Sequence, residues 1–158
     1  MAVSEEEFRD ALKKFPSGVT VVTVADDDRL HGMTASSFAS VSLIPPLILV
    51  CLDKTSHTRS LMTEGGSFAV NVLGAGQEEA SRAFAQSGEK PFDALGYRTG
   101  KLGSPLLEGA IAWLECRATQ VVDGGDHDII IGEVLESEVT DGTPLVYYDR
   151  GYRSLKDG

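Results

Sequence analysis

The chain has 158 residues, of which 42% are apolar and 24% charged, values typical of one globular domain, which we expect over residues 1–158. Its formal net charge of -10 and pI of about 4.6 argue against nucleic acid or an anionic membrane as partner. With only two cysteines, Cys51 and Cys116, a disulfide framework is not expected, and a reduced cytoplasmic setting is favoured.

The chain begins with a predicted amphipathic helix at residues 4–15. Ser4 and Glu7 have the spacing of a capping box, and Pro16 marks the end of the helix. The acidic start of this segment is unlike a signal peptide. Apolar residues recur at helical spacing and predict one apolar stripe. The positions of this stripe are Phe8, Ala11, Leu12 and Phe15.

Apolar and β-branched runs then predict about seven strands. The expected strands are 19–25, one or two within 32–46, 47–52, 67–73, 111–122, 128–138 and 144–153. A loop with a short helix is expected at 53–61, a helix at 76–85 and a loop at 87–96. The apolar run 43–52 contains two prolines and is too short to cross a bilayer, so it is interpreted as a buried strand. Because strands mostly follow one another, we expect an antiparallel barrel with flanking helices and not a doubly wound sheet.

Hydroxyl and apolar side chains alternate in segment 32–46. Thr34, Ser36, Ser40 and Ser42 have the same parity, so in a straight strand they would share one face. That face either contacts solvent or holds a ligand, and alternation alone leaves both readings open. Ser36 and Ser37 have opposite parity, so both can contact one ligand only through backbone groups or at a bend.

Common catalytic motifs do not occur in this sequence. There is no G-x-S-x-G elbow or P-loop, and the GAG of residues 74–76 lacks the third glycine of a dinucleotide fingerprint. His31, His57 and His127 are expected to lie far apart on different elements, so a metal site is not predicted. No side chain is assigned catalytic acid–base work. The protein therefore either only binds ligands, or a cofactor supplies the chemistry.

Seven segments of the chain resemble, in order and spacing, the flavin reductase-like family. These segments are FPSGVTVVTV (15–24), HGMTASSFASVSLIPPLILVCLDKTSHT (31–58), FAVNVL (68–73), FA (84–85), LEGAIAWLEC (107–116), GDHDIIIGEV (125–134) and PLVYYDRGYR (144–153). The resemblance implies a mainly β fold with flanking helices, a split β-barrel of antiparallel Greek-key type, assembled as a homodimer. It implies hydride transfer from NADH or NADPH to FMN or FAD, with reduced flavin passed to a flavin-dependent monooxygenase.

The resemblance also implies where the flavin binds. Segment 34–37 would follow the ring edge through backbone amides and hydroxyls, and the loop at 53–59 would hold the phosphate and the ribityl chain. Hydroxyls, cations and a helix start at this loop suit an anion, although Ser56 as a simple N-cap would explain the same pattern. Phe84 and Phe92 flank a loop that covers the flavin in relatives, or else belong to the core. The implied flavin-binding residues are Thr34, Ala35, Ser36, Ser37, Ser42, Asp53, Lys54, Thr55, Ser56, His57, Thr58, Phe84 and Phe92.

For the nicotinamide nucleotide, the resemblance implies His127, at the mouth of the hairpin 111–138, and more weakly Tyr152. A turn histidine bonded to its own loop and a core tyrosine are the structural alternatives. Two other functions stay open at this point. One is a pyridoxamine-phosphate-oxidase-like enzyme with tightly held FMN, and the other is a flavin-binding electron carrier without turnover.

Overall fold

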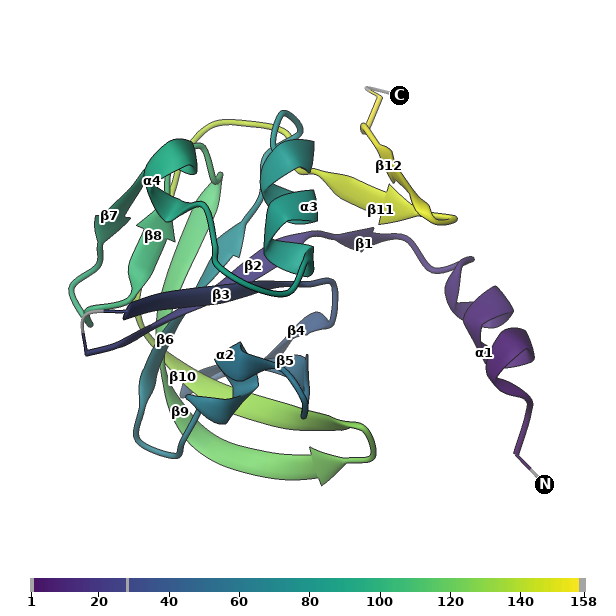
Figure 1. The fold of residues 1–158 in the computed structure, drawn as a ribbon, viewed down its shortest axis with the longest axis horizontal. Coiled ribbons are helices and arrows are strands. Elements are labelled where there is room, and N and C mark those ends of the chain that lie inside the picture. Colours follow the sequence, from purple (N-terminus) through teal and green to yellow (C-terminus); the bar gives the residue numbers. More distant parts are fainter. Residues whose placement is uncertain (1, 28, 157–158) are drawn as a thin grey trace.

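The computed structural model describes residues 2–27 and 29–156 (Figure 1). The helices are α1 (Glu5–Leu12), α2 (His57–Ser60), α3 (Glu78–Ala85) and α4 (Phe92–Leu95). The strands are β1 (Ser17–Gly18), β2 (Thr20–Asp26), β3 (Arg29–Ala35), β4 (Phe38–Leu43), β5 (Pro46–Asp53), β6 (Ser67–Val72), β7 (Tyr97–Thr99), β8 (Pro105–Leu107), β9 (Ala112–Gly124), β10 (His127–Val139), β11 (Val146–Tyr148) and β12 (Gly151–Arg153). Within these described residues, no helix is both long and apolar enough to cross a membrane.

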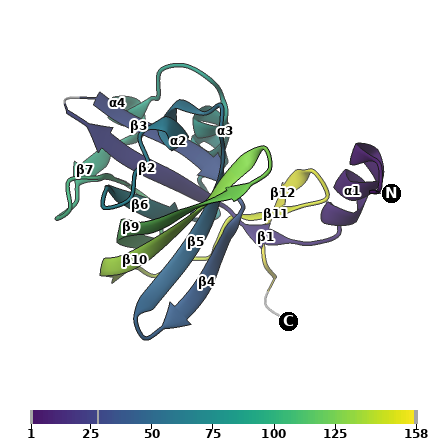
Figure 2. The same ribbon diagram turned by 90° about the horizontal axis from the view of Figure 1, so that it is seen from below.

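Seven strands form one antiparallel sheet in the order β3-β2-β6-β9-β10-β5-β4. Its two edge strands, β3 and β4, are consecutive in the chain and are separated only by Ser36 and Ser37. The sheet therefore curls back toward itself without closing, as Figure 2 shows. Pairs such as β2–β6 and β5–β10 come from distant parts of the chain, which gives Greek-key connectivity. The predicted mainly β, antiparallel split barrel with flanking helices is confirmed.

The main core fills the inside of this curved sheet. Along β5 the alternate residues Ile48, Val50 and Leu52 are buried, as the period of two requires. Phe68 of β6 is fully buried and packs against Gly132 of β10, where an added Cβ would lie 2.5 Å from the phenyl ring. Only glycine therefore lets β10 pass this close to the aromatic side chain.

A second core lies between the sheet and the segments that contain α3 and α4. Phe84 of α3 and Phe92 of α4 are buried and meet edge to face, with ring centroids 5.1 Å apart. The sequence predicted a loop at 87–96, and the structure corrects this, because α4 forms there to bury Phe92. The two-stranded sheet of β7 and β8 was not predicted either.

The C-terminal segment is a hairpin, whereas the sequence predicted one strand over 144–153. β11 turns into β12 through Asp149 and Arg150, whose backbones have φ angles of 47° and 60°. Two-residue turns of this kind favour Asn and Gly, so the Asp-Arg pair gave no sequence signal of a turn. β11 also pairs with β1, which brings residues 146–148 beside the N-terminal segment.

Helix α1 confirms the predicted capping box, in which Ser4 and Glu7 bond reciprocally. Its apolar stripe, however, is not buried in this chain. Phe8 and Leu12 are each 54% exposed, and Phe15, just after the helix, is 76% exposed. Figure 1 shows α1 projecting away from the barrel.

Candidate functional site

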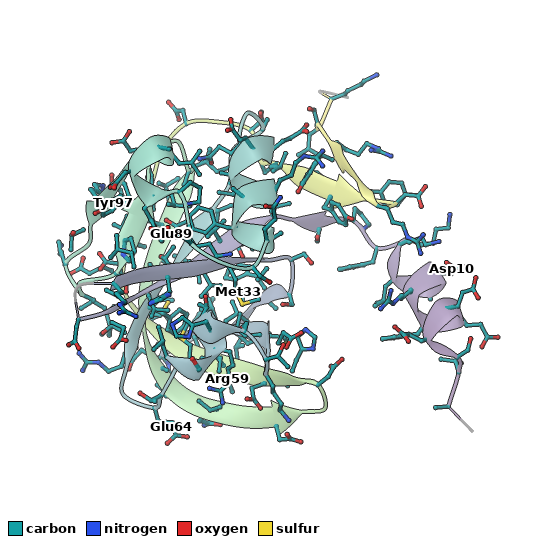
Figure 3. The ribbon with its side chains drawn as sticks, in the orientation of Figure 1. Asp10, Met33, Arg59, Glu64, Glu89 and Tyr97 are labelled. Atoms are coloured by element: carbon teal, nitrogen blue, oxygen red, sulfur yellow. The ribbon has the colours of Figure 1, made fainter. Side chains whose placement is uncertain are left out.

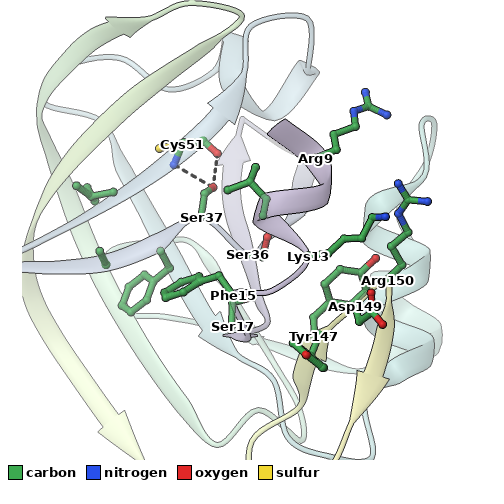
Figure 4. A pocket seen from close by; sticks show the side chains of 15 residues that line it. Arg9, Lys13, Phe15, Ser17, Ser36, Ser37, Cys51, Tyr147, Asp149 and Arg150 are labelled. Atoms are coloured by element: carbon green, nitrogen blue, oxygen red, sulfur yellow. Dashed lines mark hydrogen bonds between the residues drawn. The ribbon is translucent and has the colours of Figure 1, made fainter. Parts of the chain in front are cut away.

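Two cavities open beside the segments that the sequence predicted as the binding site. The first has a volume of about 680 Å³, and Figure 4 shows its side chains. Its lining residues are Arg9, Leu12, Lys13, Phe15, Ser17, Ser36, Ser37, Phe38, Ala39, Leu49, Cys51, Tyr147, Tyr148, Asp149 and Arg150. The second cavity has a volume of about 470 Å³. Its lining residues are His31, Gly32, Met33, Thr34, Asp53, Thr55, Ser56, His57, Thr58, Phe84, Ala85, Gln86, Ser87, Gly88 and Lys90.

The same two stretches of chain border both cavities. Ser36 and Cys51 line the first cavity, whereas Thr34 and Asp53, each two residues away, line the second. The position of this border follows from the fold, because the turn between the edge strands β3 and β4 lies beside the end of β5. An extended ligand that reached from one cavity into the other would contact both stretches.

In segment 34–37, the hydrogen-bond donors that remain available to a ligand are backbone amides. The hydroxyl of Thr34 donates to the Ser81 carbonyl (2.6 Å), and that of Ser37 donates to the Cys51 carbonyl (2.8 Å). These protons are therefore committed to protein acceptors. Within residues 2–27 and 29–156, the amides of Ser36 and Ser37 donate to no other residue. The chain leaves the strand conformation here, so both residues can face one ligand despite their opposite parity.

Ala35 and Ser42 line neither of these two cavities. Ala35 is buried at the end of β3, where its carbonyl accepts from the Thr20 hydroxyl (2.6 Å). Ser42 lies farther along β4, opposite Leu47 and next to an irregularity in the strand pairing. The single hydroxyl face expected for segment 32–46 does not exist, since the chain turns at residues 36–37 and the register shifts again after Ser40.

The loop after β5 is held by its own side chains. One carboxylate oxygen of Asp53 accepts from the Thr55 hydroxyl (2.6 Å) and amide (2.7 Å), and these bonds lower the pKa of Asp53. Ser56 is the N-cap of α2 and accepts from the Arg59 amide (3.0 Å). The amides of His57 and Thr58 donate to no acceptor in the described part of the chain. The loop thus presents two free backbone donors beside the second cavity.

Lys54 lines neither cavity, although the resemblance implied a phosphate contact for it. Its ammonium group bonds to Asp123 and to the Gly125 carbonyl (2.6 Å) in the β9–β10 hairpin. The bond to Asp123 raises the pKa of Lys54. Its backbone amide donates to Asp126 (3.1 Å), so the whole residue joins the loop to the hairpin.

Lys90 does line the second cavity, although its sequence context predicted no such role. Its ammonium group lies near the end of α3, where it donates to the carbonyls of Phe84 (3.2 Å) and Gln86. Burial lowers the pKa of Lys90. Its one sequence signal is its place two residues before Phe92, in the loop for which the resemblance implied a contact with the flavin.

Two of the histidines are in contact, which corrects the expectation that all three lie far apart. The rings of His31 and His57 meet edge to face, with centroids 4.3 Å apart, at the second cavity. Nε2 of His31 is buried and has no hydrogen-bond partner among the described residues. Burial, and then the neighbouring His57, lower the pKa of His31. No group of three or more His, Cys, Asp or Glu side chains in residues 2–27 and 29–156 could hold a metal ion.

His127 begins β10 and faces the loop after β5. Its Cα is paired with that of Asp53 across β5 and β10, which brings the hairpin to the edge of the second cavity. Nδ1 of His127 lies 2.7 Å from a carboxylate oxygen of Asp126, and this contact lowers the pKa of Asp126. The ring is 44% exposed and therefore accessible to a ligand.

Tyr152 and Phe92 are packed against α3 and its surroundings and line neither cavity. The Tyr152 hydroxyl lies 2.7 Å from that of the buried Ser81, and the Arg82 guanidinium lies 4.8 Å from the tyrosine ring centroid. Phe84 lines the second cavity while it supports the core.

Comparison with known proteins agrees with this arrangement. Residues 12–156 match the family described as flavin reductase like domain. The chain belongs to the flavin reductase family. A probable flavin reductase of Rhizobium meliloti (strain 1021) is 45% identical over 145 residues, which cover 91% of this chain but only 47% of that protein. The reductase subunit HsaB of a flavin-dependent monooxygenase from Mycobacterium tuberculosis is 35% identical, covering 98% of this chain and 84% of the subunit.

A solved structure gives the same fold for a flavin reductase relative. It is the NADH:FAD oxidoreductase SgcE6 of Streptomyces globisporus C-1027, in complex with NAD and FAD fragments. That protein is 38% identical, with a TM-score of 0.90, and the match covers 99% of this chain and 97% of the other. The curved sheet and its flanking helices are therefore shared by a relative whose structure was solved with NAD and FAD fragments.

Proposed function

We propose that this flavin reductase transfers hydride from NADH or NADPH to FMN or FAD and supplies the reduced flavin to a flavin-dependent monooxygenase. One observation carries the proposal: Ser36 and Ser37 line one cavity, His57 and Thr58 line the adjoining one, and the backbone amides of all four have no acceptor among the described residues. A flavin has a polar ring edge at one end and a phosphate at the other, and it needs donors at both. The names of the relatives support the electron donor and the monooxygenase.

The first cavity suits the isoalloxazine ring. Its wall contains the apolar side chains of Phe38, Leu49 and Tyr147, which offer packing to a flat aromatic ligand. The amides of Ser36 and Ser37 would then donate to the ring edge. Preorganised donors at this place stabilise negative charge that develops on the reduced ring.

The second cavity suits the ribityl chain and the phosphate. The amides of His57 and Thr58 and the ammonium group of Lys90 are donors for phosphate oxygens. The Asp53 carboxylate would repel a phosphate, so its role is to hold the loop through its bonds to Thr55. We therefore place the phosphate at the end of the loop that is farther from Asp53, beside the start of α2.

The chain's own contribution to the reaction is orientation. When bound, the flavin accepts the hydride from the nicotinamide, so no protein side chain needs to transfer a proton. His127, held by Asp126, would contact the nucleotide at the edge of the second cavity. When the protein holds the nucleotide and the flavin in contact, the reaction between them becomes a step within one complex. This lowers the entropic part of the activation barrier, which is a large contribution to catalysis of this kind.

We also propose a homodimer in the cytoplasm. The exposed apolar stripe of α1 and the tip of the β4–β5 hairpin, where Leu43 and Ile44 are 89% and 93% exposed, offer apolar surface to a second copy. Both cysteines are free thiols, which suits a reducing compartment.

Steady-state oxidation of NADH and NADPH, followed with added FMN, FAD and riboflavin, tests the function. We expect a rate that rises and saturates with flavin concentration, and a lower KM for FMN than for riboflavin because riboflavin lacks the phosphate. If no flavin raises the rate above background, the proposed activity is wrong. Equal KM values for FMN and riboflavin would instead refute the phosphate site at α2.

Two further measurements on the same purified protein distinguish the other two functions from flavin reduction. An electron carrier would keep a yellow flavin through gel filtration and would not oxidise NADH when flavin is added. A pyridoxamine-phosphate-oxidase-like enzyme would form pyridoxal phosphate from pyridoxamine phosphate.

A further inference from the structure

An ion pair joins the two halves of the proposed site. Arg59, in α2, donates from Nε to a carboxylate oxygen of Asp128 in β10 at 2.6 Å. Asp128 is the residue after His127, and α2 follows directly on the loop at 53–56. Both side chains are largely buried, at 20% and 11% exposure. Figure 3 shows Arg59 between α2 and the β9–β10 hairpin.

Further contacts fix both partners of this pair. Nη1 of Arg59 donates to the Met62 carbonyl (3.1 Å), so the guanidinium group is held at two points. Asp128 also lies 3.8 Å from the Lys54 ammonium group, which itself bonds to the hairpin turn. A planar guanidinium held in this way fixes direction as well as distance, unlike a surface ion pair. Arg59 is one of the cations of the loop at 53–59 that suit an anion, but in the structure its guanidinium group is bonded to Asp128.

We infer that Arg59 is a positioning residue: through Asp128, it holds the loop that binds the flavin phosphate and the hairpin that carries His127 in one fixed arrangement. This inference rests on the proposed function, because it assigns the two ligands to these two elements. Arg59 lines neither cavity, so it acts on each ligand through another residue. Loss of the pair lets the two elements move apart, and both ligands then bind less well.

The test compares Arg59→Met with His127→Ala and with the double variant. Arg59→Met is expected to raise KM for FMN and for NADH by roughly tenfold each, because small misplacements of binding groups are costly. His127→Ala is expected to raise KM for NADH and to leave that for FMN unchanged. In the double variant, Arg59→Met should raise KM for FMN again but add nothing to KM for NADH, since residues in one network are not additive.

Two other variants separate positioning from simple stability. Arg59→Lys keeps the charge but loses the planar fork, so we expect smaller increases in both KM values, of about threefold. Lys101→Met breaks the exposed Lys101–Glu136 pair (2.8 Å), which lies outside the site, and both KM values should stay within about twofold of wild type. The thermal midpoint of each variant is measured alongside. If Arg59→Met does not fold, the KM values of Arg59→Lys alone decide whether Arg59 is a positioning residue.

Unchanged KM values in the folded Arg59 variants, or additive effects of Arg59→Met and His127→Ala on NADH, would overturn the inference. A failure of the proposed function would look different, because wild-type protein would then show no flavin-dependent NADH oxidation. In that case two measurements still test whether the Arg59–Asp128 pair holds the loop and the hairpin together. One is FMN affinity from fluorescence quenching, and the other is amide hydrogen exchange at residues 124–128. Faster exchange in Arg59→Met supports this role of the pair, and equal exchange contradicts it.

Discussion

His31 is a partly buried imidazole, and its surroundings make the stability of the protein sensitive to pH. Nε2 has no hydrogen-bond partner among the described residues, and burial is the main cause that lowers the pKa of His31 from its usual 6.5. Above that pH the side chain is neutral in both the folded and the unfolded chain. As the pH falls through 6.5, the unfolded chain takes up a proton that the folded chain resists, so the free energy of unfolding decreases.

We therefore predict that His31→Gln flattens this part of the stability profile. Urea unfolding of the protein without ligand, measured from about pH 8 down to about pH 5.5, should show a steeper loss of stability for wild type than for the variant. Above pH 7.5 the difference between the two should be nearly constant, since His31 is uncharged there in both states. Parallel profiles over the whole range would contradict the lowered pKa of His31 in the folded chain.

At the scale of single residues, the sequence located the segments that border the cavities better than it located individual side chains. Segment 34–37 and the loop at 53–58 do lie at cavities, because the fold places the chain there whatever the side chains do. Lys54 instead found acceptors on a hairpin about 70 residues later, and Lys90 entered the cavity. A local sequence pattern cannot predict contacts of this kind, because the partners lie far apart in the sequence.

Strand β8 is tied to the main sheet by a buried polar network centred on Asn71 in β6. The Asn71 side chain donates to the Val21 carbonyl (2.9 Å) and to the Thr23 hydroxyl (3.0 Å), and it accepts from the Leu107 amide (2.8 Å). The Thr23 hydroxyl donates onward to Pro105 (2.5 Å). These bonds satisfy groups that have no access to water, and they explain how a polar residue fits in the core.

Asn71→Leu should therefore destabilise the protein strongly. A leucine of similar size removes the acceptor of the buried Leu107 amide, and each buried group left unpaired costs about 1–3 kcal/mol. We expect the free energy of unfolding in urea to fall by about 2–4 kcal/mol with little change in m value. Thr140→Val, which removes one long bond at the surface (3.4 Å), serves as the control and should change stability by less than about 0.5 kcal/mol. Equal losses in the two variants would refute the network's importance.

At the scale of elements, the regular patterns predicted the fold well. The apolar run of β5 and the apolar and β-branched runs of the β9–β10 hairpin identified strands that the structure contains, and the capping box placed the start of α1. Short elements such as β7, β8 and α4 were missed, since three or four residues carry too little periodicity to be recognised. Their positions are set by packing on the second core.

In the molecule as a whole, contacts within the single chain do not explain why α1 is stable. It has eight residues, none of them buried, and isolated helices of this length are marginal in water. Its apolar stripe continues into the wall of the first cavity through Leu12 and Phe15. A helix of this kind is stable when its stripe packs on a partner, and a second copy of the chain is the partner that we propose.

We predict that Leu12→Glu combined with Phe15→Glu converts a dimer into a monomer. Sedimentation at micromolar concentrations should show wild type at twice the mass of the chain and the variant at the mass of one chain, because an interface cannot bury two unpaired carboxylates. Val139→Glu places the same charge on another apolar residue, 76% exposed at the end of β10, and should remain dimeric. A wild-type monomer, or a double variant that stays dimeric, would show that α1 does not form the contact. Because the stripe borders the first cavity, the monomeric variant should also bind flavin more weakly than the control does.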